Sequence, residues 1–427
     1  MNISNYFYRK SLAVIFFRIF AAFSSLAMTI AISRSLSIND AGLFFLAMTI
    51  ITVLVNVSTM GFTTTTVRYV AQNAALEKWN VVRGLIRYAL SSVIIFSAIV
   101  FFIGLLFSSN ISDFLQKSDL IKPLRVMLIA LPLLVVIHII AHAFQGIHRQ
   151  LISVSLLNIF PQLSVLFLVF LSNFFEYNTS ALSISFFFLI GVLMSLSLGC
   201  FKWFSQEKLN TNIDLSLVKK FSNSAKPIWL VVVMSTLVQW SSLLVLGIYE
   251  SSEDVALYSV AHRVSLLVSL ILVAVNSVAS PNFAALSGKN EKNSLRESFN
   301  MSNRLIIFLG LPCIFLIILL SDIVMGLFGA NYIDGSKLLI ILIIGQAFNV
   351  LTGSVGVILN MRGFEDDLKK AVLIASLTAI FASMILIPLY GVIGAALATA
   401  FAIAMQNLVC SIYVWKRLKI SIFGIFN

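Results

Sequence analysis

The sequence predicts an all-α integral membrane protein of about twelve transmembrane helices, built as two six-helix halves. Three observations lead to this prediction: a very apolar composition, a series of apolar stretches of membrane-spanning length, and a weak internal repeat. Of the 427 residues, 59% are hydrophobic and 11% are charged, and the mean hydropathy is +1.01. About a quarter of the residues of soluble domains are charged. A soluble fold of this size would therefore have too few charges to cover its surface.

Twelve stretches contain the roughly 20 mostly apolar residues that a transmembrane helix needs. They are residues 11–33, 42–62, 85–107, 123–144, 151–170, 182–201, 227–247, 255–280, 305–322, 338–359, 371–389 and 392–415. The first stretch follows Arg9 and Lys10 as in a signal peptide, but Arg18 interrupts it and no small-x-small cleavage site follows. We therefore expect a first transmembrane helix there. The last two stretches are separated only by a very short turn at residues 388–391.

The positions of lysine and arginine predict the orientation, because cytoplasmic loops carry an excess of these residues. With the loops assigned alternately from a cytoplasmic N-terminus, 22 of the 29 lie inside and 5 outside, and Arg18 and Arg263 lie within spans. We therefore expect both termini in the cytoplasm. This bias also explains the net charge of +12 without a nucleic-acid partner, since the basic residues form short runs between apolar stretches.

The sequence gives little support to an enzyme or a metal protein. The longest external loop, about residues 108–122, is too short for a catalytic domain, and no group of acid, base and nucleophile is visible. Cys200, Cys313 and Cys410 lie within apolar stretches and have neither a disulfide framework nor a metal-ligand spacing. We expect no enzyme activity, no cofactor and no metal.

Short motifs recur in the same order in the two halves, which we place at residues 1–210 and 211–427. Asp40-Ala-Gly-Leu-Phe opens the second span, and Asp254-Val-Ala-Leu-Tyr opens the eighth, 214 residues later. Gly146 follows the fourth span and Gly363 the tenth, at an offset of 217. Six spans per half give both halves the same orientation, so we expect a parallel repeat with a pseudo-twofold axis along the membrane normal.

Together with two further motifs, these motifs resemble the multidrug/oligosaccharidyl-lipid/polysaccharide exporter superfamily, and the resemblance implies a MATE-like transporter fold. The further motifs are Tyr258-Ser-Val-Ala-His-Arg263, followed by Ser280-Pro-Asn-Phe-Ala-Ala-Leu, and Gly391-Val-Ile-Gly-Ala-Ala-Leu-Ala. The resemblance covers the whole chain and is closest to the Wzx-type O-antigen flippases.

That resemblance implies a function, a substrate and partners. The protein would lie in the bacterial inner membrane and move an oligosaccharide linked to undecaprenyl pyrophosphate from the cytoplasmic to the outer leaflet by alternating access. The oligosaccharide would be a repeat unit of O-antigen, the polysaccharide of lipopolysaccharide, or of a similar surface polysaccharide. Membrane lipids, a polysaccharide polymerase and a chain-length regulator would be its partners.

Two arginines within the spans are the first candidates for substrate binding. A pyrophosphate needs cations, and arginine offers a permanent charge with a planar donor fork. Charges within spans are costly and usually face a cavity. Arg18 and Arg263 meet this description, and the runs around both resemble runs that carry cavity arginines in lipid II flippases. The alternative for each is snorkelling to the interface or a structural ion pair.

Three histidines within the spans have two open roles each. His262 either adds charge for the substrate when protonated or hydrogen-bonds a neighbouring helix. His138 and His142 are four residues apart and so share one face of the fourth span. They are either a titrating pair for proton coupling or head-group contact, or packing residues. A metal is a poor fit, because no third ligand accompanies them.

Neutral polar residues within the spans form a second group of candidates for contacts with sugar hydroxyls. They are Gln239, Asn276, Gln346 and Asn349. Hydrogen bonds between helices are the alternative for each. Asn349 follows Gln346 by three residues, so both lie on one helical face, as in a shared cavity wall.

Other transporter classes fit the sequence less well. A cation-coupled multidrug exporter of the same superfamily usually needs a carboxylate within the membrane, but Asp40, Asp254 and Asp322 all lie near the predicted external surface. Lipid II flippases typically carry helices beyond the twelve found here. A major-facilitator sugar carrier would show a Gly-rich loop marked by Asp and Arg after the second span, and residues 63–68 do not match it.

Overall fold

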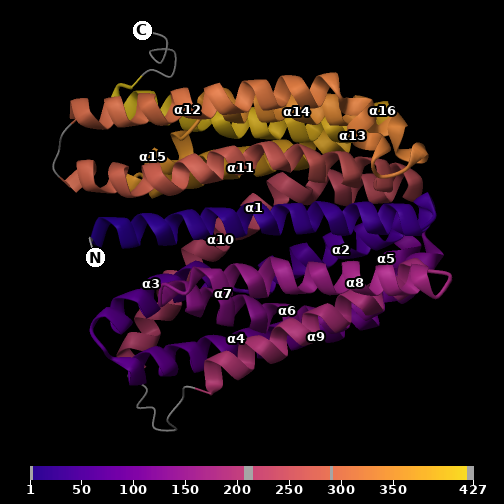
Figure 1. Ribbon diagram of the computed structural model, residues 1–427, viewed down its shortest axis with the longest axis horizontal. Helices are drawn as coiled ribbons and strands as arrows, with labels where there is room; N and C mark the ends of the chain where they lie inside the picture. The colour runs from indigo at the N-terminus through magenta and orange to yellow at the C-terminus, as the bar shows by residue number, and fades with distance from the viewer. Residues whose placement is uncertain (1–2, 206–214, 289–291, 421–427) are drawn as a thin grey trace. The chain divides into compact units, whose positions relative to one another are not determined.

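The computed structural model describes residues 3–205, 215–288 and 292–420, and in these ranges the chain is helical and contains no β-strand (Figure 1). Eleven helices of this described part are long and apolar enough to cross a membrane. Each of the twelve predicted spans lies in or overlaps one of them, because the last two share the 54-residue helix α16. The predicted all-α membrane architecture is confirmed.

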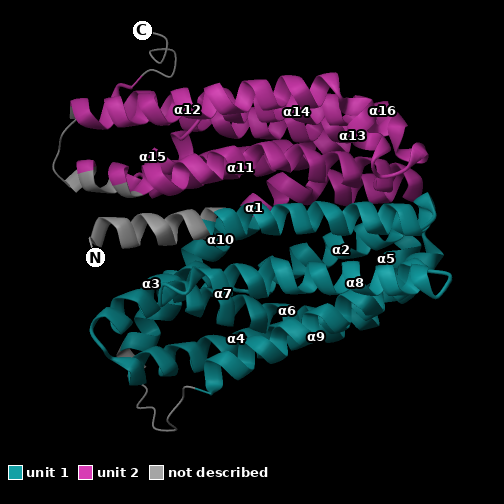
Figure 2. Cartoon of the chain, viewed as in Figure 1, with its two compact units in different colours: residues 1–233 teal, residues 234–427 magenta. Residues whose placement is uncertain are grey.

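The chain divides into two compact units, Met1–Val233 and Met234–Asn427, with the division inside α10 (Figure 2). The repeat boundary predicted between residues 210 and 211 stays a prediction. The elements up to the division are α1 (Ile3–Ser35), α2 (Ile38–Ser58), α3 (Phe62–Ala75), α4 (Trp79–Leu106), α5 (Ser108–Phe114), η1 (Ser118–Leu120), α6 (Ile121–Gly146), α7 (Gln150–Val154), the π-helical turn η2 (Ser155–Ile159), α8 (Phe160–Phe174), α9 (Ala181–Phe204) and α10 (Leu215–Tyr249). Those that follow are α11 (Ser252–Gly288), α12 (Lys292–Leu319), α13 (Ser321–Gly326), η3 (Ala330–Gly335), α14 (Ser336–Thr352), α15 (Val355–Met361) and α16 (Glu365–Leu418).

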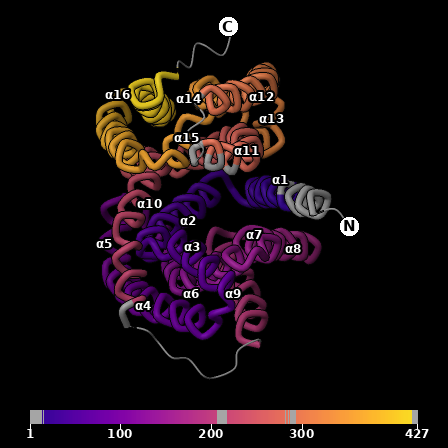
Figure 3. The backbone as a smooth tube through the Cα atoms, turned by 90° about the vertical axis from the view of Figure 1, so that its left-hand side faces the viewer, coloured from indigo at the N-terminus to yellow at the C-terminus, as the bar shows by residue number. Residues whose placement is uncertain are grey.

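Each unit is built around one central helix. In the first unit α6 packs against α2, α3, α4 and α9. Its apolar residues lie on all sides, as expected for a helix enclosed by others. In the second unit α14 packs against α11, α12 and α16, and Figure 3 shows the helices of this unit nearly end-on. The central helices correspond to the fourth and the tenth predicted spans, so the same position in the repeat has the same packing role.

The starts of α2 and α11 repeat one capping arrangement. The hydroxyl of Ser37 caps α2 by accepting from the backbone N–H of Asp40 at 3.1 Å and donates to the Asp40 carboxylate at 3.0 Å. Ser251 and Asp254 do the same at 3.1 and 2.6 Å. Such reciprocal bonds satisfy the free N–H groups of a first helical turn. Both aspartates therefore stabilise helix starts.

The turns after the fourth and tenth spans also match, but not at the glycines paired in the sequence. The residue with positive φ is His148 (φ 60°) in the first turn and Gly363 (φ 78°) in the second, an offset of 215 from 148 to 363. In both turns the next residue donates its N–H five residues back, Arg149 to Phe144 and Phe364 to Leu359, both at 2.9 Å. The expectation that Gly146 and Gly363 mark equivalent turn positions was wrong, because Gly146 is the last residue of α6.

Gly146 is required instead by helix α3, which lies between the second and third predicted spans. A Cβ at Gly146 would lie 2.9 Å from the Cβ of Val70 in α3. Three of the four threonines of α3 are buried, Thr65 and Thr66 fully and Thr63 nearly so, whereas Thr64 is exposed. A threonine-rich segment of low hydropathy does not register as apolar, so the sequence pattern did not reveal this packed helix.

Helix α10 is fixed to the first unit along its N-terminal half. Phe221 stacks on Phe62 with the ring centroids 5.2 Å apart, and the indole N–H of Trp229 donates to the carbonyl of Val57 at 2.8 Å. Gly61, between α2 and α3, has φ 74°, and a Cβ there would lie 2.3 Å from the Ala225 carbonyl oxygen. The absence of a side chain at Gly61 allows this close approach.

Helix α16 is two spans joined at a break. Gly391 has φ 59° and ψ −139°, outside the helical region, at the turn predicted between the last two spans. A straight helix of 54 residues would extend about 80 Å. Instead, Arg417 at one end donates from Nε to the Asp367 carboxylate at the other end at 2.7 Å, and the Asp367 side chain is 4% exposed. The two segments therefore form a hairpin.

Candidate functional site

The tenth predicted span is broken near its end, and polar side chains gather at the break. Helix α14 ends at Thr352, Gly353 takes φ 66° and ψ −127°, and α15 begins at Val355. The fully buried side chain of Asn303 in α12 accepts from the Ser354 N–H at 2.9 Å and donates to the Thr352 carbonyl at 3.3 Å. A helix interrupted within a membrane protein needs such partners for the backbone groups that the break frees.

Two other helices extend this polar cluster. The Ser354 hydroxyl donates to the side-chain oxygen of Asn276 in α11 at 2.6 Å. The Thr352 hydroxyl lies 3.1 Å from the side-chain oxygen of Asn407 in α16 and 2.8 Å from the Phe348 carbonyl, and its single hydrogen is shared between these two acceptors. We call Asn276, Asn303, Thr352, Ser354 and Asn407 the break cluster. Asn276 was predicted as a substrate contact, and here it makes the alternative contact, a hydrogen bond between helices.

Gln346 and Asn349 lie together on one face of α14, as their spacing predicts. The Asn349 amide donates to the Gln346 side-chain oxygen at 3.3 Å. Gln346 is buried and Asn349 is half-buried. Asn349 lies one turn before the break, so polar side chains occur from Gln346 on α14 to Ser354, which precedes α15. A substrate contact for either residue stays a prediction.

Arg263 is half-buried in α11, about 16 Å along the helix axis from Ser252. A hydrocarbon core is about 30 Å thick, so a helix that starts at one surface brings this position close to mid-depth. Asn276 lies on the same helix about 20 Å further along. The structure therefore does not bring Arg263 together with the break cluster.

His262, next to Arg263, is buried between two aromatic rings. Its ring stacks on Tyr258, with the centroids 5.7 Å apart and the planes 8° from parallel, and meets Trp240 edge-on at 5.2 Å. Its Nδ1 is buried and has no hydrogen-bond partner within the described part of the chain. At 1% exposure the side chain fills the interior of the unit. Its predicted contact with substrate stays a prediction.

Beside this histidine runs a chain of buried hydroxyls that the sequence analysis did not identify. The hydroxyls of Tyr258 and Thr399 are 2.7 Å apart, Thr399 donates to Ser242 at 2.8 Å, and Ser242 and Ser383 are 2.9 Å apart. The chain links α10, α11 and both segments of α16. Serine and threonine are common in membrane helices and carry no spacing signal, so such a chain is visible only in the fold.

Arg18 and Gln239 are both exposed on the units to which they belong. Arg18 lies about 25 Å along α1 from Ser35, within the apolar stretch predicted at residues 11–33. Its side chain is exposed, as it would be either toward a cavity or when snorkelling toward the interface. Contact with substrate stays a prediction for both residues.

His138 and His142 face the same side of α6, as predicted from their spacing. Their rings stack with centroids 6.3 Å apart and planes 17° from parallel. Each Nδ1 bonds the carbonyl four residues earlier, at 2.8 Å to Leu134 and 2.7 Å to His138. Because a carbonyl only accepts, each Nδ1 carries the proton, and in the neutral ring Nε2 is left as an acceptor. No metal-binding group of three ligands occurs in the described residues. Proton coupling stays a prediction.

Comparison with known families and proteins gives a consistent result. The model of a family described as polysaccharide biosynthesis protein matches residues 8–287, and the MatE family model matches residues 227–389. A probable low-salt glycan biosynthesis flippase of Haloferax volcanii is 30% identical over 179 residues, which cover 41% of this chain and 37% of that protein. A probable flippase of the same organism is 24% identical over 172 residues, 40% of this chain and 36% of the relative. The chain thus matches little more than a third of the length of these curated relatives.

Solved structures share the fold at low sequence identity. The lipid II flippase MurJ in an inward closed conformation superposes with a TM-score of 0.75 at 17% identity, covering 94% of this chain and 87% of MurJ. An inward-facing MATE multidrug transporter superposes with a TM-score of 0.79 at 12% identity, covering 95% of both chains. These names are those of transporters and flippases, in line with the expectation that the chain is not an enzyme. The predicted MATE-like fold is confirmed.

Proposed function

Because this chain belongs to the polysaccharide biosynthesis protein family, we propose that it is a flippase that moves a lipid-linked oligosaccharide across a membrane. The family match over residues 8–287 is the observation that carries the proposal. The MATE-like fold and the glycan-flippase relatives support it independently.

The polar groups within the helices suit such a substrate. A lipid-linked oligosaccharide combines an anionic phosphate with a hydrated glycan, and both must pass the hydrocarbon core. Arg263 offers a cation near mid-depth in the second unit, and Arg18 offers one within the first predicted span. Gln346 and Asn349 add amides that can exchange their mutual bond for sugar hydroxyls.

We further propose the substrate and setting that the sequence resemblance implies. The carrier lipid is undecaprenyl pyrophosphate, the glycan is a repeat unit of O-antigen type, and the membrane is a bacterial inner membrane with both termini in the cytoplasm. A polymerase and a chain-length regulator then use the product on the outer side. The excess of basic residues in the predicted cytoplasmic loops supports the orientation.

A cation-coupled multidrug exporter is the second candidate, favoured by the MatE match over residues 227–389. Such an exporter needs a carboxylate free to bind a cation. Asp40 and Asp254 instead accept hydrogen bonds at the starts of α2 and α11, and Asp367 pairs with Arg417. Because these three carboxylates already take part in hydrogen bonds or an ion pair, they favour the flippase over the exporter.

The test uses the purified full chain in proteoliposomes loaded with a fluorescent oligosaccharide on undecaprenyl pyrophosphate. A quencher that cannot cross the membrane reports how much lipid reaches the other leaflet. We expect transport by wild type and a loss of about tenfold or more in Arg263→Ala, because removal of a charge-assisted contact costs about 1.5–3 kcal/mol. Arg18→Ala should also slow transport, and Lys122→Ala, at an exposed helix end, should not.

The outcomes separate the function from the site. Transport by wild type and by all three variants would keep the flippase and reject the arginines as substrate contacts. If wild type moves no lipid-linked oligosaccharide but exports a cationic dye against a sodium or proton gradient, the exporter replaces the flippase. Arg263→Lys keeps the charge but not the fork, so intermediate transport would indicate bidentate binding of phosphate.

A further inference from the structure

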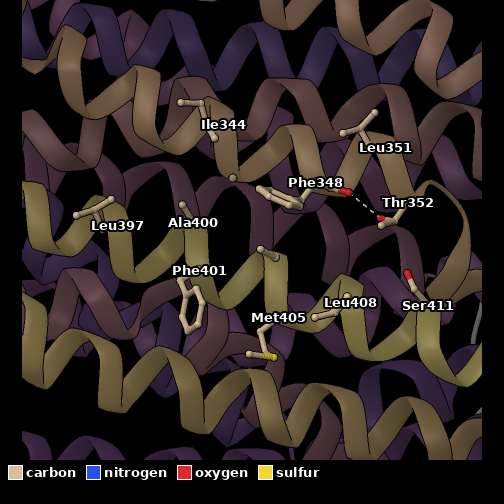
Figure 4. Close-up of a pocket in the computed structure, with 12 residues that line it drawn as sticks. Ile344, Phe348, Leu351, Thr352, Leu397, Ala400, Phe401, Met405, Leu408 and Ser411 are labelled. Atoms are coloured by element: carbon tan, nitrogen blue, oxygen red, sulfur yellow. Dashed lines mark hydrogen bonds between the residues drawn. The ribbon is translucent and has the colours of Figure 1, made fainter. Parts of the chain in front are cut away.

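An apolar groove of about 640 Å³ runs between α14 and the second segment of α16, within the second unit (Figure 4). The two helices approach closely at Gly345, where a Cβ would lie 2.8 Å from the Cβ of Ala400, so small residues form the floor. Phe348 on α14 and Phe401 on α16 are among the larger side chains along it, and both are about half exposed. The groove is therefore open at its surface and narrow at its base.

Only one end of the groove is polar, and Thr352 and Ser411 line that end. The Thr352 hydroxyl lies 3.1 Å from the side-chain oxygen of Asn407, and the Ser411 hydroxyl donates to the backbone carbonyl of Asn407 at 2.6 Å. The other side chains of the lining, from Ile344 and Leu397 onward, are apolar. The groove thus has the polarity of a lipid, with hydrocarbon along its length and polar groups at one end.

Basic residues lie beyond this polar end, and one of them, Lys419, is in line with the groove. Leu408, Ser411 and Trp415 follow one another at helical spacing on α16, so they share one face. Lys419, one turn further, places its Nζ 5.3 Å from the centroid of the Trp415 ring. Lys416 is exposed, about 7.5 Å along the axis from Ser411. The end that would hold a lipid head group is therefore cationic.

We propose that this groove binds the polyisoprenoid tail of the lipid-linked substrate and that its phosphates lie at the end marked by Lys416 and Lys419. This inference rests on the proposed flippase function and adds a hydrocarbon contact to the head-group contacts. The volume lies within the range of about 300–1,000 Å³ typical of ligand pockets, so the groove holds one section of the tail and the bilayer holds the rest.

The lining also distinguishes an isoprenoid from the straight chains of bulk phospholipids. Ala400 and Ala404 are much smaller than neighbours such as Phe348 and Phe401, so the groove wall has notches beside them. The regularly spaced methyl branches of an isoprenoid fill notches of this kind, whereas a straight acyl chain leaves them empty. Empty space beside a groove wall forfeits dispersion contacts, so the branched chain is preferred.

The experiment uses the full chain in vesicles of phosphatidylethanolamine and phosphatidylglycerol. One probe is undecaprenyl diphosphate with a diazirine in its tail, and the comparison probe is phosphatidylglycerol with a diazirine in an acyl chain. After irradiation, mass spectrometry locates the labelled peptides. We expect the isoprenoid probe to label residues 344–352 and 397–411 in excess over the phospholipid probe.

Two variants and a charge change sharpen the test. Ala404→Trp fills the groove and should lower isoprenoid labelling about tenfold, the effect of losing the contacts of about two methylene groups. Ala382→Trp, a half-buried alanine of α16 outside the groove, should leave labelling unchanged. The double variant Lys416→Glu, Lys419→Glu should reduce labelling by the diphosphate probe and not by an uncharged undecaprenol probe.

Equal labelling by the isoprenoid and phospholipid probes would mean that bulk lipid occupies the groove, and it would overturn the proposal. Isoprenoid labelling that persists in Ala404→Trp would overturn it as well. Transport of the fluorescent substrate is followed in parallel samples of the same vesicles. Transport by wild type without preferential labelling rejects the tail site and leaves the flippase intact. Preferential labelling that Ala404→Trp abolishes, without any transport, supports the lipid site and rejects the flippase.

Discussion

Asn303 replaces hydrogen bonds that the chain loses where α14 is interrupted. Its side-chain oxygen accepts from the Ser354 N–H at 2.9 Å, and its amide donates to the Thr352 carbonyl at 3.3 Å. The residue is fully buried, so water cannot take over either role. In the sequence, Asn303 lies just outside the predicted span 305–322. Nothing in the sequence shows that a helix break lies 50 residues away and needs its amide.

We expect Asn303→Ala to lower the stability of the second unit by about 1–3 kcal/mol, since it leaves a buried N–H and a buried carbonyl without these partners. The midpoint of thermal unfolding in detergent, compared with wild type, measures the loss. Asn293→Ala on the same helix is the control, because Asn293 is exposed. Equal midpoints for the two variants would show that Asn303 does not support the break.

The two glycines near the end of α14 and in α15 differ in whether the fold requires a glycine there. Gly353 ends α14 with φ 66° and ψ −127°, and a Cβ there would lie 2.2 Å from the side-chain oxygen of Asn303. Gly356, three residues later in α15, has only an ordinary contact at 3.8 Å, to a side-chain methyl of Leu368. A glycine-to-alanine substitution at each of the two positions therefore tests whether the break between α14 and α15 requires Gly353.

Gly353→Ala should be strongly destabilising, because alanine is strained at this φ and its Cβ displaces Asn303. Gly356→Ala should be neutral or stabilising by about 0.5–1 kcal/mol, since alanine favours a helix interior. Detergent melts of the two variants and wild type make the comparison. If the chain tolerates Gly353→Ala as well as Gly356→Ala, the interruption is not required for the fold.

A second pair of glycines tests how α10 is held to the first unit. Gly61 and Gly363 have similar positive φ values, 74° and 78°, but a Cβ at Gly61 would lie 2.3 Å from the Ala225 carbonyl oxygen. At Gly363, nothing in the described part of the chain apart from its two sequence neighbours would lie within 4 Å of a Cβ. Gly363→Ala should therefore cost only the backbone strain, about 1–2 kcal/mol. His148 at the matching position of the other half already accepts this conformation.

Gly61→Ala should cost more, because it also pushes α10 away and weakens the bond from Trp229 to the Val57 carbonyl. We expect a lower unfolding midpoint than for Gly363→Ala and faster proteolysis around residues 215–233. Similar midpoints and proteolysis rates for the two variants would mean that the contact at Gly61 does not hold α10.

For the whole molecule, the sequence predicted the spans well because lipid demands long apolar helices, and length and hydropathy measure this directly. The turn at Gly391 was also predicted, since Pro388 and Gly391 interrupt one long apolar stretch.

The interruption at Gly353 and the packed helix α3 were not predicted. Glycine is frequent in membrane helices, and its φ depends on neighbours such as Asn303 that only the fold brings close. Of the candidate site residues, the sequence spacing predicted that Gln346 lies beside Asn349 and His138 beside His142. Both members of each pair lie on the same helix, so helical geometry alone brings them together.

Orientation is the whole-molecule property that gives transport a direction, and the charge pattern predicts it. With 22 of 29 basic residues on one side, reversing the chain would carry most of them across the membrane. The test labels single cysteines with a membrane-impermeant maleimide after Cys200, Cys313 and Cys410 are changed to serine. Asn110→Cys in α5 should react in intact cells, and Ser205→Cys after α9 should react only in permeabilised cells, since both positions are partly or fully exposed but predicted on opposite sides. The control, in which all three cysteines are serine and no new cysteine is added, must stay unlabelled. The reverse pattern would place the basic loops outside, and the proposed direction of transport would then be reversed with them.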